Sequence, residues 1–418
     1  MKRVVTLLAG VLCVAACADQ GGGPPHPVDR LDFPVAVTAD PRGDVVWVTS
    51  GNFDLAFGGA AVLAIDVRTN EFIPEAAFQI GGFPGPLHLL ERDGEVVAGY
   101  ILSRDEDRLY HVSIGGSARQ PVVTCDGGDR VTNGILKCPR SRAIDTASVE
   151  NSDGDKTELS LGEEPFGAVV RKSRAANEPD LLLTGGMRDG NLATFTLDET
   201  DGTPTLVGNL DLLNGVFAMT ENPSTGRVYT ASKLTNVFQV LEIDGTPADP
   251  DDITVENPFV TTVANIVIPE GLAVDRARGL AVSVDGTRLY ASYRAPDSVV
   301  VIDIGQDVSG SAADRVIAKI PVSNNPGDIV VVAGATLADE RVYVACYSEN
   351  LIEVIDPNLG VVVDSIRTGR GPFGLAHIEN TAAGINRLYV TNFLDESVGV
   401  IELDPTSPYY LTQVAEIR

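Results

Sequence analysis

Short runs of alternating and β-branched apolar residues recur along this chain, separated by polar turns rich in Gly, Asp and Asn. The clearest run covers residues 387–404, RLYVTNFLDESVGVIELD, and similar runs cover residues 227–244, 288–303 and 341–356. Each run predicts two β-strands around a short polar turn, with a further apolar strand before it. Helical periodicity is nearly absent, so the pattern predicts an all-β protein.

One large apolar residue marks the second strand of each predicted repeat. The markers, spaced roughly 45–60 residues apart with one longer gap, are Trp47, Val97, Leu183, Tyr229, Tyr290, Tyr343 and Tyr389. Such a repeat predicts a seven-bladed β-propeller of four-stranded antiparallel blades over residues 31–418. The longer gap, at about residues 115–158, predicts an insertion within the second blade.

The Tyr-Val-Thr-Asn of residues 389–392, with its Arg-Leu-Tyr lead-in and Val-Ile-Glu exit, resembles the repeat of the YVTN β-propellers. The resemblance covers about residues 33–418 and is strongest in the last three repeats. Cys346, Tyr293 and Ser232 stand at the Asn position, which suggests a structural role for it. The family includes surface-layer and adhesion-type proteins, lactonase-like enzymes and redox-associated propellers, so the resemblance implies a fold and leaves the function open.

The beginning of the chain predicts export. A basic pair, Lys2 and Arg3, precedes an apolar run too short to span a bilayer, which predicts a signal peptide over residues 1–16. The run ends in Val-Ala-Ala-Cys, which resembles the lipobox of bacterial lipoproteins and implies lipidation of Cys17. Residues 17–30, which begin with the lipidated cysteine, are then predicted to form a flexible tether. Together these features predict an outer-membrane lipoprotein that faces the periplasm or the exterior. An ordinary secretory signal is the alternative.

The net charge limits the classes of possible partner, and the cysteine content predicts a disulfide. A formal net charge of −27 without clustered Lys or Arg argues against nucleic acid as a ligand. Cys125 and Cys138 flank a Gly- and Asp-rich loop in a chain destined for an oxidising compartment, which predicts a disulfide. We interpret Cys346 as a small buried residue.

The loop into each inner strand of a propeller lies near the central channel. Aligned across the repeats, the first two residues of these strands are mostly apolar or Gly, but they include His88, Arg278 and Asp328. These three, with Phe373, are the candidates for a ligand site at the channel mouth. The preferred interpretation at this point is more modest, namely an ion pair and a solvated loop histidine.

The sequence contains no set of residues that identifies a catalytic or metal centre. Residues 151–155 alternate oxygen-bearing side chains as calcium loops do, but Lys156 stands where an EF-hand loop needs Gly. We therefore predict no cofactor, with Ca²⁺ or another divalent metal as the alternative.

Two functions from different classes fit this pattern. The first, which we prefer, is a lipid-anchored, non-enzymatic propeller that binds an envelope protein or polymer. The alternative is a lactonase-like hydrolase that acts on a small exported substrate in the channel, with or without a metal, using Asp328, His88 and Glu270.

Overall fold

The computed structural model describes residues 23–150, 156–176, 178–244, 257, 259–269, 277–306 and 310–418. The signal peptide, Cys17, the acidic loop at 151–155 and Glu270 lie outside the described residues. Among the described residues, strands are joined by turns and by five short 3-10 helices, and none of these helices has the length and apolarity to cross a membrane.

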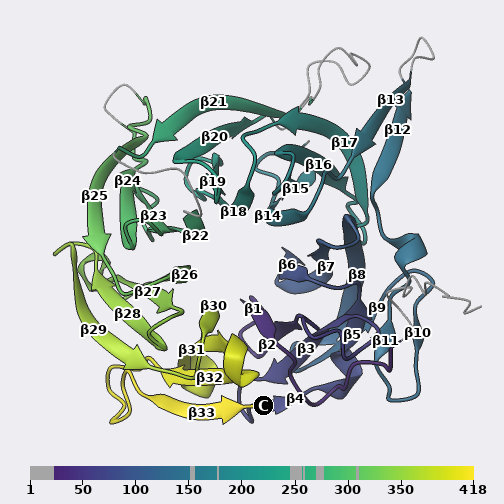
Figure 1. Ribbon diagram of the computed structural model, residues 1–418, viewed down its shortest axis with the longest axis horizontal. Coiled ribbons are helices and arrows are strands. Elements are labelled where there is room, and N and C mark those ends of the chain that lie inside the picture. The colour runs from purple at the N-terminus through teal and green to yellow at the C-terminus, as the bar shows by residue number, and fades with distance from the viewer. Residues whose placement is uncertain are drawn as a thin grey trace, which may run out of the picture.

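In the part of the chain that the structure describes, seven sheets follow one another around a central axis, in a β-propeller arrangement (Figure 1). Six of them are four-stranded and antiparallel, with their strands in sequence order. Their strands are β6 Pro84–Arg92, β7 Glu95–Ser103, β8 Arg108–Ser117 and β9 Gln120–Thr124; β14 Pro165–Arg171, β15 Asp180–Gly186, β16 Asn191–Leu197 and β17 Pro204–Asp211; β18 Val216–Glu221, β19 Val228–Ser232, β20 Val237–Ile243 and β21 Val260–Val267; β22 Ala277–Val282, β23 Arg288–Tyr293, β24 Ser298–Asp303 and β25 Arg315–Pro321; β26 Pro326–Val332, β27 Arg341–Cys346, β28 Leu351–Asp356 and β29 Val361–Arg367; β30 Pro372–Asn380, β31 Ile385–Asn392, β32 Ser397–Glu402 and β33 Gln413–Ile417. The 3-10 helices are η1 Pro74–Ala76, η2 Arg140–Arg142, η3 Leu337–Asp339, η4 Thr381–Ala383 and η5 Phe393–Asp395.

The remaining sheet departs from the four-stranded plan. It has seven strands: β1 Pro34–Ala39, β2 Val45–Ser50, β3 Ala60–Asp66, β4 Glu71–Phe72, β5 Phe78–Ile80, β10 Asp129–Arg130 and β11 Leu136–Lys137. Strand β11 pairs with β5 in parallel, so this sheet is mixed. The prediction of seven four-stranded blades was therefore wrong, because the structure has six and places a larger sheet in the seventh position. The added strands have only two residues each, too few to show a period in the sequence.

The first strand of each sheet lies innermost. Each of these inner strands contacts the inner strands of the two neighbouring sheets, which closes a ring in the order β1, β6, β14, β18, β22, β26 and β30. Antiparallel connectivity brings the loop before each inner strand to the same face of the ring as the turn between the second and third strands. We call this the mouth face.

The middle strands are buried on both sides because each sheet is covered by its neighbours. In β23 and β24, ten of the twelve side chains are buried. The β-branched and aromatic residues of RLYASY and SVVVID suit this double-sided packing, which explains the continuous apolar runs of the sequence. Outer strands such as β29 keep exposed residues on their outward face.

The marker tyrosines connect neighbouring sheets. The hydroxyls of Tyr229, Tyr290 and Tyr389 each donate a 3.1 Å hydrogen bond to a side-chain oxygen of the following sheet, on Asp314, Glu340 and Asn70 respectively.

The second sheet uses Tyr100 in this way, with the Gly202 carbonyl as acceptor. The marker proposed there, Val97, was misplaced by three residues. The pairing of β6 with β7 contains two register shifts. The marker was placed by its spacing along the sequence, which does not allow for the second of these shifts.

The predicted disulfide between Cys125 and Cys138 is present. The loop that it closes begins after β9, so the added segment lies between the second and third sheets, whereas we expected it inside the second blade. Strand β11 in this loop returns to the first sheet, and the hairpin of β12 Thr146–Glu150 and β13 Lys156–Ser160 follows. The segment thus widens the first sheet and leaves the ring intact.

Residues 23–32 pack on the first sheet, although we expected a flexible tether up to residue 30. His26 is fully buried: its backbone N–H donates to Gln79, its ring nitrogen Nε2 lies 3.1 Å from Ser50 Oγ, and its carbonyl accepts from Asn133. Phe57 lies against the His26 ring. The prediction of a flexible tether rested on the composition of the segment alone, whereas partners 24 to 107 residues away in the chain supply these contacts.

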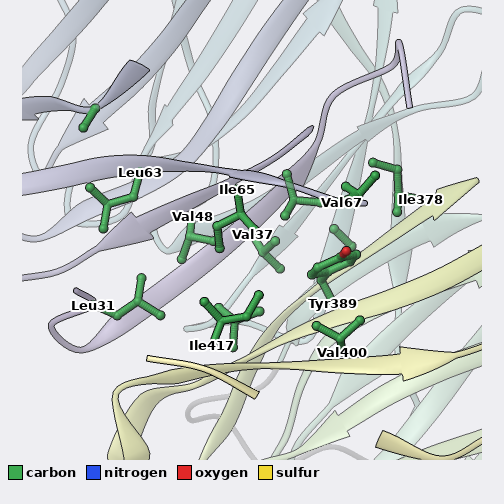
Figure 2. Close-up of a cluster of buried hydrophobic side chains, with 14 of the residues drawn as sticks. Leu31, Val37, Val48, Leu63, Ile65, Val67, Ile378, Tyr389, Val400 and Ile417 are labelled. Atoms are coloured by element: carbon green, nitrogen blue, oxygen red, sulfur yellow. The ribbon is translucent and has the colours of Figure 1, made fainter. Parts of the chain in front are cut away.

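The ring closes between the first and last sheets through side chains. Leu31, Val48 and Leu63 from the first part of the chain pack with Tyr389 and Ile417 in one buried cluster (Figure 2). The Arg387 guanidinium also donates to the Val67 carbonyl at 2.8 Å. The last sheet is built wholly from residues 372–417, so no strand is exchanged across this junction.

Candidate functional site

A cavity of about 270 Å³ lies at the centre of the ring. All seven inner strands contribute to its wall, mostly with small and apolar residues. Among the described residues, the charged ones in this wall are Arg278, Arg294 and Asp328. The cavity is therefore largely apolar with a few polar groups, as ligand sites commonly are.

A repeated backbone irregularity directs residues into the cavity. In every sheet of the ring, the pairing of the first two strands shifts register directly after the first residue of the inner strand. Such a β-bulge leaves the following residue unpaired and turns it out of the sheet. Unpaired residues next to each shift are Val35, Gly85, Phe166, Phe217, Arg278, Gly327 and Phe373.

The residue before the inner strand has a left-handed backbone in all six sheets where it is described. Phe33, Phe83, Glu164 and Asn325 have φ between 45° and 56° there, and the other two positions hold Gly215 and Gly371. Side chains other than glycine adopt this region at a cost, so the turn into the channel is locally strained.

The four predicted candidates, His88, Arg278, Asp328 and Phe373, all line this one cavity. The alignment behind them needs correction in two repeats. The structural equivalents of Arg278 are Gly85 and Phe217, where we aligned Leu87 and Val216. Leu87 and Val216 are buried in the sheets instead.

Asp328 is tied to the backbone. Its two carboxylate oxygens accept hydrogen bonds of 2.9 Å from the backbone N–H groups of Ile329 and Leu375. Burial raises its pKa to about 6, while these two bonds act in the opposite direction. At neutral pH the carboxylate is therefore charged, and it joins the sheet of β26 to that of β30.

His88 is a neutral polar group in the wall. Burial lowers its pKa to about 4, so the imidazole is uncharged at neutral pH. Its Nε2 atom is buried and has no hydrogen-bond partner among the described residues. The earlier interpretation as a solvated loop histidine was wrong, because His88 lies within the inner strand β6 and faces the channel.

Arginine and aromatic side chains stack along one side of the cavity. The Arg278 guanidinium carbon lies 4.7 Å from the centre of the Phe217 ring, whose centre is 4.5 Å from that of Phe166. Arg104 covers Phe166 at 5.6 Å. These contacts make a continuous cation–π stack from the second to the fifth sheet. The predicted ion pair between Arg278 and Asp328 is not among the bonds of Asp328, which are to backbone N–H groups.

A cluster of aromatic rings on the mouth face was missed by the sequence analysis. The Phe393 ring centre lies 5.2 Å from Phe33, 5.3 Å from Phe53 and 6.2 Å from Phe373, and Phe53 lies 4.9 Å from Phe83. Tyr347 adjoins both Phe373 and Phe393. We call these six residues the aromatic cluster. The signal was an aromatic residue next to the loop proline in Phe33-Pro34 and Phe83-Pro84.

Metal ligation finds no support in the described part of the chain. No three His, Cys, Asp or Glu side chains there are grouped so as to hold a metal ion. The calcium candidate at 151–155 lies outside the described residues. Cys346 is buried, and burial raises its thiol pKa to about 12, which suits an inert core residue.

Known structures of similar shape are propellers from proteins of different kinds. Hydrazine synthase of Kuenenia stuttgartiensis aligns with a TM-score of 0.57 at 15% identity, covering 91% of this chain and 98% of that one. A candidate 6-phosphogluconolactonase of Bacteroides fragilis aligns with a TM-score of 0.56 at 16% identity, covering 83% and 87%. Sqt1 of Saccharomyces cerevisiae aligns with a TM-score of 0.53 at 10% identity, covering 90% and 97%.

At such identities the likeness establishes the fold alone. No family model matches this sequence, and no curated protein matches it in sequence.

Proposed function

We propose that this chain is a YVTN-type β-propeller lipoprotein of the bacterial envelope that binds an envelope protein or polymer through its mouth face. The lipid on Cys17 would hold it at the outer membrane, and the propeller would present the aromatic cluster and the channel to its partner. The acidic net charge, −27, agrees with a partner other than nucleic acid.

One observation carries the choice of binding over catalysis. Among the residues that the structure describes, the one carboxylate in the cavity wall is on Asp328; it accepts two backbone N–H bonds and serves to join two sheets. A general base must instead offer an oxygen to a substrate proton. Around it the wall presents aromatic and small residues, which are typical of binding surfaces.

The alternative is a lactonase-like hydrolase. It is supported by the presence of Asp328 and His88 in one cavity, and by the fold that the candidate lactonase of B. fragilis shares. This function requires that lactones be hydrolysed by the purified protein and that Asp328→Asn abolish the reaction.

Site-specific cross-linking in intact cells tests the binding function. A photoreactive amino acid at Leu394, 47% exposed on the mouth face, is expected to give adducts of discrete mass with one partner. The matched control is Leu359, 69% exposed at the turn between β28 and β29 on the opposite face, which is expected to give none.

The same experiment tests the anchor. Cys17→Ser is expected to move the chain from the membrane fraction to the soluble fraction and to weaken the Leu394 adduct. Equal adducts from both positions, or none from either, would contradict the proposed binding face.

A further inference from the structure

The chain from the proposed lipid anchor enters the propeller at one edge of the mouth face. Gly23, the first described residue, lies against Phe57 and Gly58, and a Cβ added to it would be 2.7 Å from the Gly58 nitrogen. The Pro24 carbonyl accepts a 2.9 Å hydrogen bond from the Gly58 N–H. Phe57 and Gly58 belong to the turn between β2 and β3, and the turns between second and third strands lie on the mouth face. The chain from the anchor therefore reaches the first sheet on its mouth-face side.

The distance that this part of the chain can span is small. Cys17 and Gly23 are six residue steps apart, so a fully extended backbone joins them over at most about 21 Å. A small folded domain is about 30 Å across. A soluble partner of ordinary size therefore has no room between the bilayer and this edge of the mouth face.

Large apolar side chains are exposed at the same edge. Phe53 and Leu55 are 38% and 63% exposed in the turn between β2 and β3, and Leu394 is 47% exposed in the turn between β31 and β32. The two turns are adjacent, because the Phe53 ring centre lies 5.3 Å from that of Phe393. The edge nearest to the anchor is thus an apolar surface shared by the first and last sheets.

This edge is also negatively charged. Asp54 and Glu396 are exposed in the same two turns. Burial, and then the charges of these two carboxylates, raise the pKa of the buried Asp32 carboxyl to about 6, while Arg30 acts in the opposite direction. The Oδ2 atom of Asp32 has no hydrogen-bond partner among the described residues. We call the five exposed residues the anchor rim, namely Phe53, Asp54, Leu55, Leu394 and Glu396.

The mixed chemistry of the anchor rim favours a protein surface over the lipid surface itself. Anionic lipid headgroups repel carboxylates, and the hydrocarbon of the bilayer excludes them. A protein surface can cover the apolar residues while its Lys or Arg side chains pair with the carboxylates.

We propose that the anchor rim binds a protein embedded in the same membrane as the lipid anchor, at a surface that presents Lys or Arg beside apolar side chains. This inference rests on the proposed binding function and names the class of its partner. The lipid and the rim are then two linked points of attachment, and the short chain between them holds the rim at a high effective concentration near the partner.

Lengthening the chain between anchor and propeller tests where the partner lies. A Gly-Ser linker of about 20 residues, inserted directly before Gly23, is expected to reduce the Leu394 photoadduct in intact cells about ninefold, because effective concentration falls roughly as the −3/2 power of linker length. The matched control carries the same linker after Leu359, in the turn on the opposite face, and should give an unchanged adduct. A soluble partner predicts the opposite sign, since a longer linker opens space at the mouth face.

Membrane fractionation tests whether the partner is embedded. The Cys17→Ser chain has no lipid of its own, so its Leu394 adduct can resist extraction with alkaline carbonate only through the partner. The adduct from this variant, although weaker, is expected to remain with the membrane.

Removing the charges of the rim tests the chemistry of the partner surface. Asp54→Asn combined with Glu396→Gln keeps hydrogen-bonding groups at both positions and is expected to reduce the Leu394 adduct about threefold, as the loss of exposed ion pairs does. The matched control is Glu199→Gln, at an exposed residue in the turn between β16 and β17 on the opposite face, which should leave the adduct unchanged.

The outcomes separate the two proposals. A Leu394 adduct that grows or stays equal with the longer linker, that is extracted by carbonate in Cys17→Ser, or that is unchanged without the rim charges would overturn the membrane-embedded partner. Labelling of lipid alone at Leu394 would also overturn it, in favour of the bilayer surface. Equal protein adducts from Leu394 and Leu359 would instead overturn the proposed binding face.

Discussion

The first and last sheets meet at the junction of the ring, and they are stabilised in different ways. The last sheet keeps the regular repeat, and its Tyr389 hydroxyl bonds to Asn70 of the first sheet. In the first sheet Trp47 occupies the equivalent place, but its indole N–H donates to Asp40 of the same sheet. The first sheet therefore lacks the tyrosine bond that joins the second, fourth, fifth and seventh sheets to the next sheet.

The first sheet has contacts that the last sheet lacks. Strands β10 and β11, closed by the disulfide of Cys125 and Cys138, extend it at its outer edge, and residues 23–32 cover it through His26. Trp47 is fully buried against the second sheet. The comparison indicates that the marker tyrosine makes contacts between sheets, and that the first sheet, which lacks it, is held instead by the disulfide-closed loop and by added packing.

The largest expected effect comes from opening the shared cluster. Tyr389→Ala removes a fully buried ring between the two sheets and is expected to lower the free energy of unfolding by about 3–5 kcal/mol, as large-to-small core substitutions do. Urea denaturation measures it. Tyr409→Ala, at a residue that is 61% exposed in the same sheet, is the control and should change stability by less than about 0.5 kcal/mol. Equal losses of unfolding free energy in the two variants would show that the buried cluster at the junction stabilises the protein no more than an exposed position does.

Removing the disulfide is expected to have the next largest effect. The double variant Cys125→Ser/Cys138→Ser should lose about 3 kcal/mol, because the closed loop of this length restricts the unfolded chain. Hydrogen exchange should quicken in β5 and β11 and stay unchanged in β30–β33. Uniform quickening in both sheets would refute the idea that the loop stabilises the first sheet specifically.

The smallest expected effect is the loss of one tyrosine hydrogen bond, and its cost in stability is expected to depend on the acceptor. Tyr290→Phe leaves the buried Glu340 carboxylate short of one donor and should cost about 1.5–3 kcal/mol, the range for bonds to charged groups. Tyr389→Phe removes a bond to the neutral Asn70 side chain and should cost about 0.5–1.5 kcal/mol. Thermal unfolding of both variants measures the difference. The reverse order would show that the acceptor charge does not set the strength of these bonds.

Features that depend on neighbouring residues were predictable from sequence. The repeat, the strand pairs and the disulfide all arise within short stretches of chain, and the bulge residues Arg278 and Asp328 stood out because the repeat aligns them. The aromatic cluster was not predictable, since Phe33, Phe53 and Phe393 come together only when the ring closes. The role of β11 was hidden for the same reason, because its partner β5 lies more than fifty residues earlier.

The junction without strand exchange has a topological consequence. Each of the six four-stranded sheets is encoded in one uninterrupted stretch of 41 to 52 residues, from residues 84–124 to residues 372–417, and these stretches begin and end at equivalent places. Ring closure is then the association of two surfaces that belong to one chain. Because the chain already holds these surfaces close together, they lose less translational entropy on associating than two separate chains would. If the surfaces part, each exposes a face complementary to the other, so two opened copies can exchange partners and form a dimer by domain swapping.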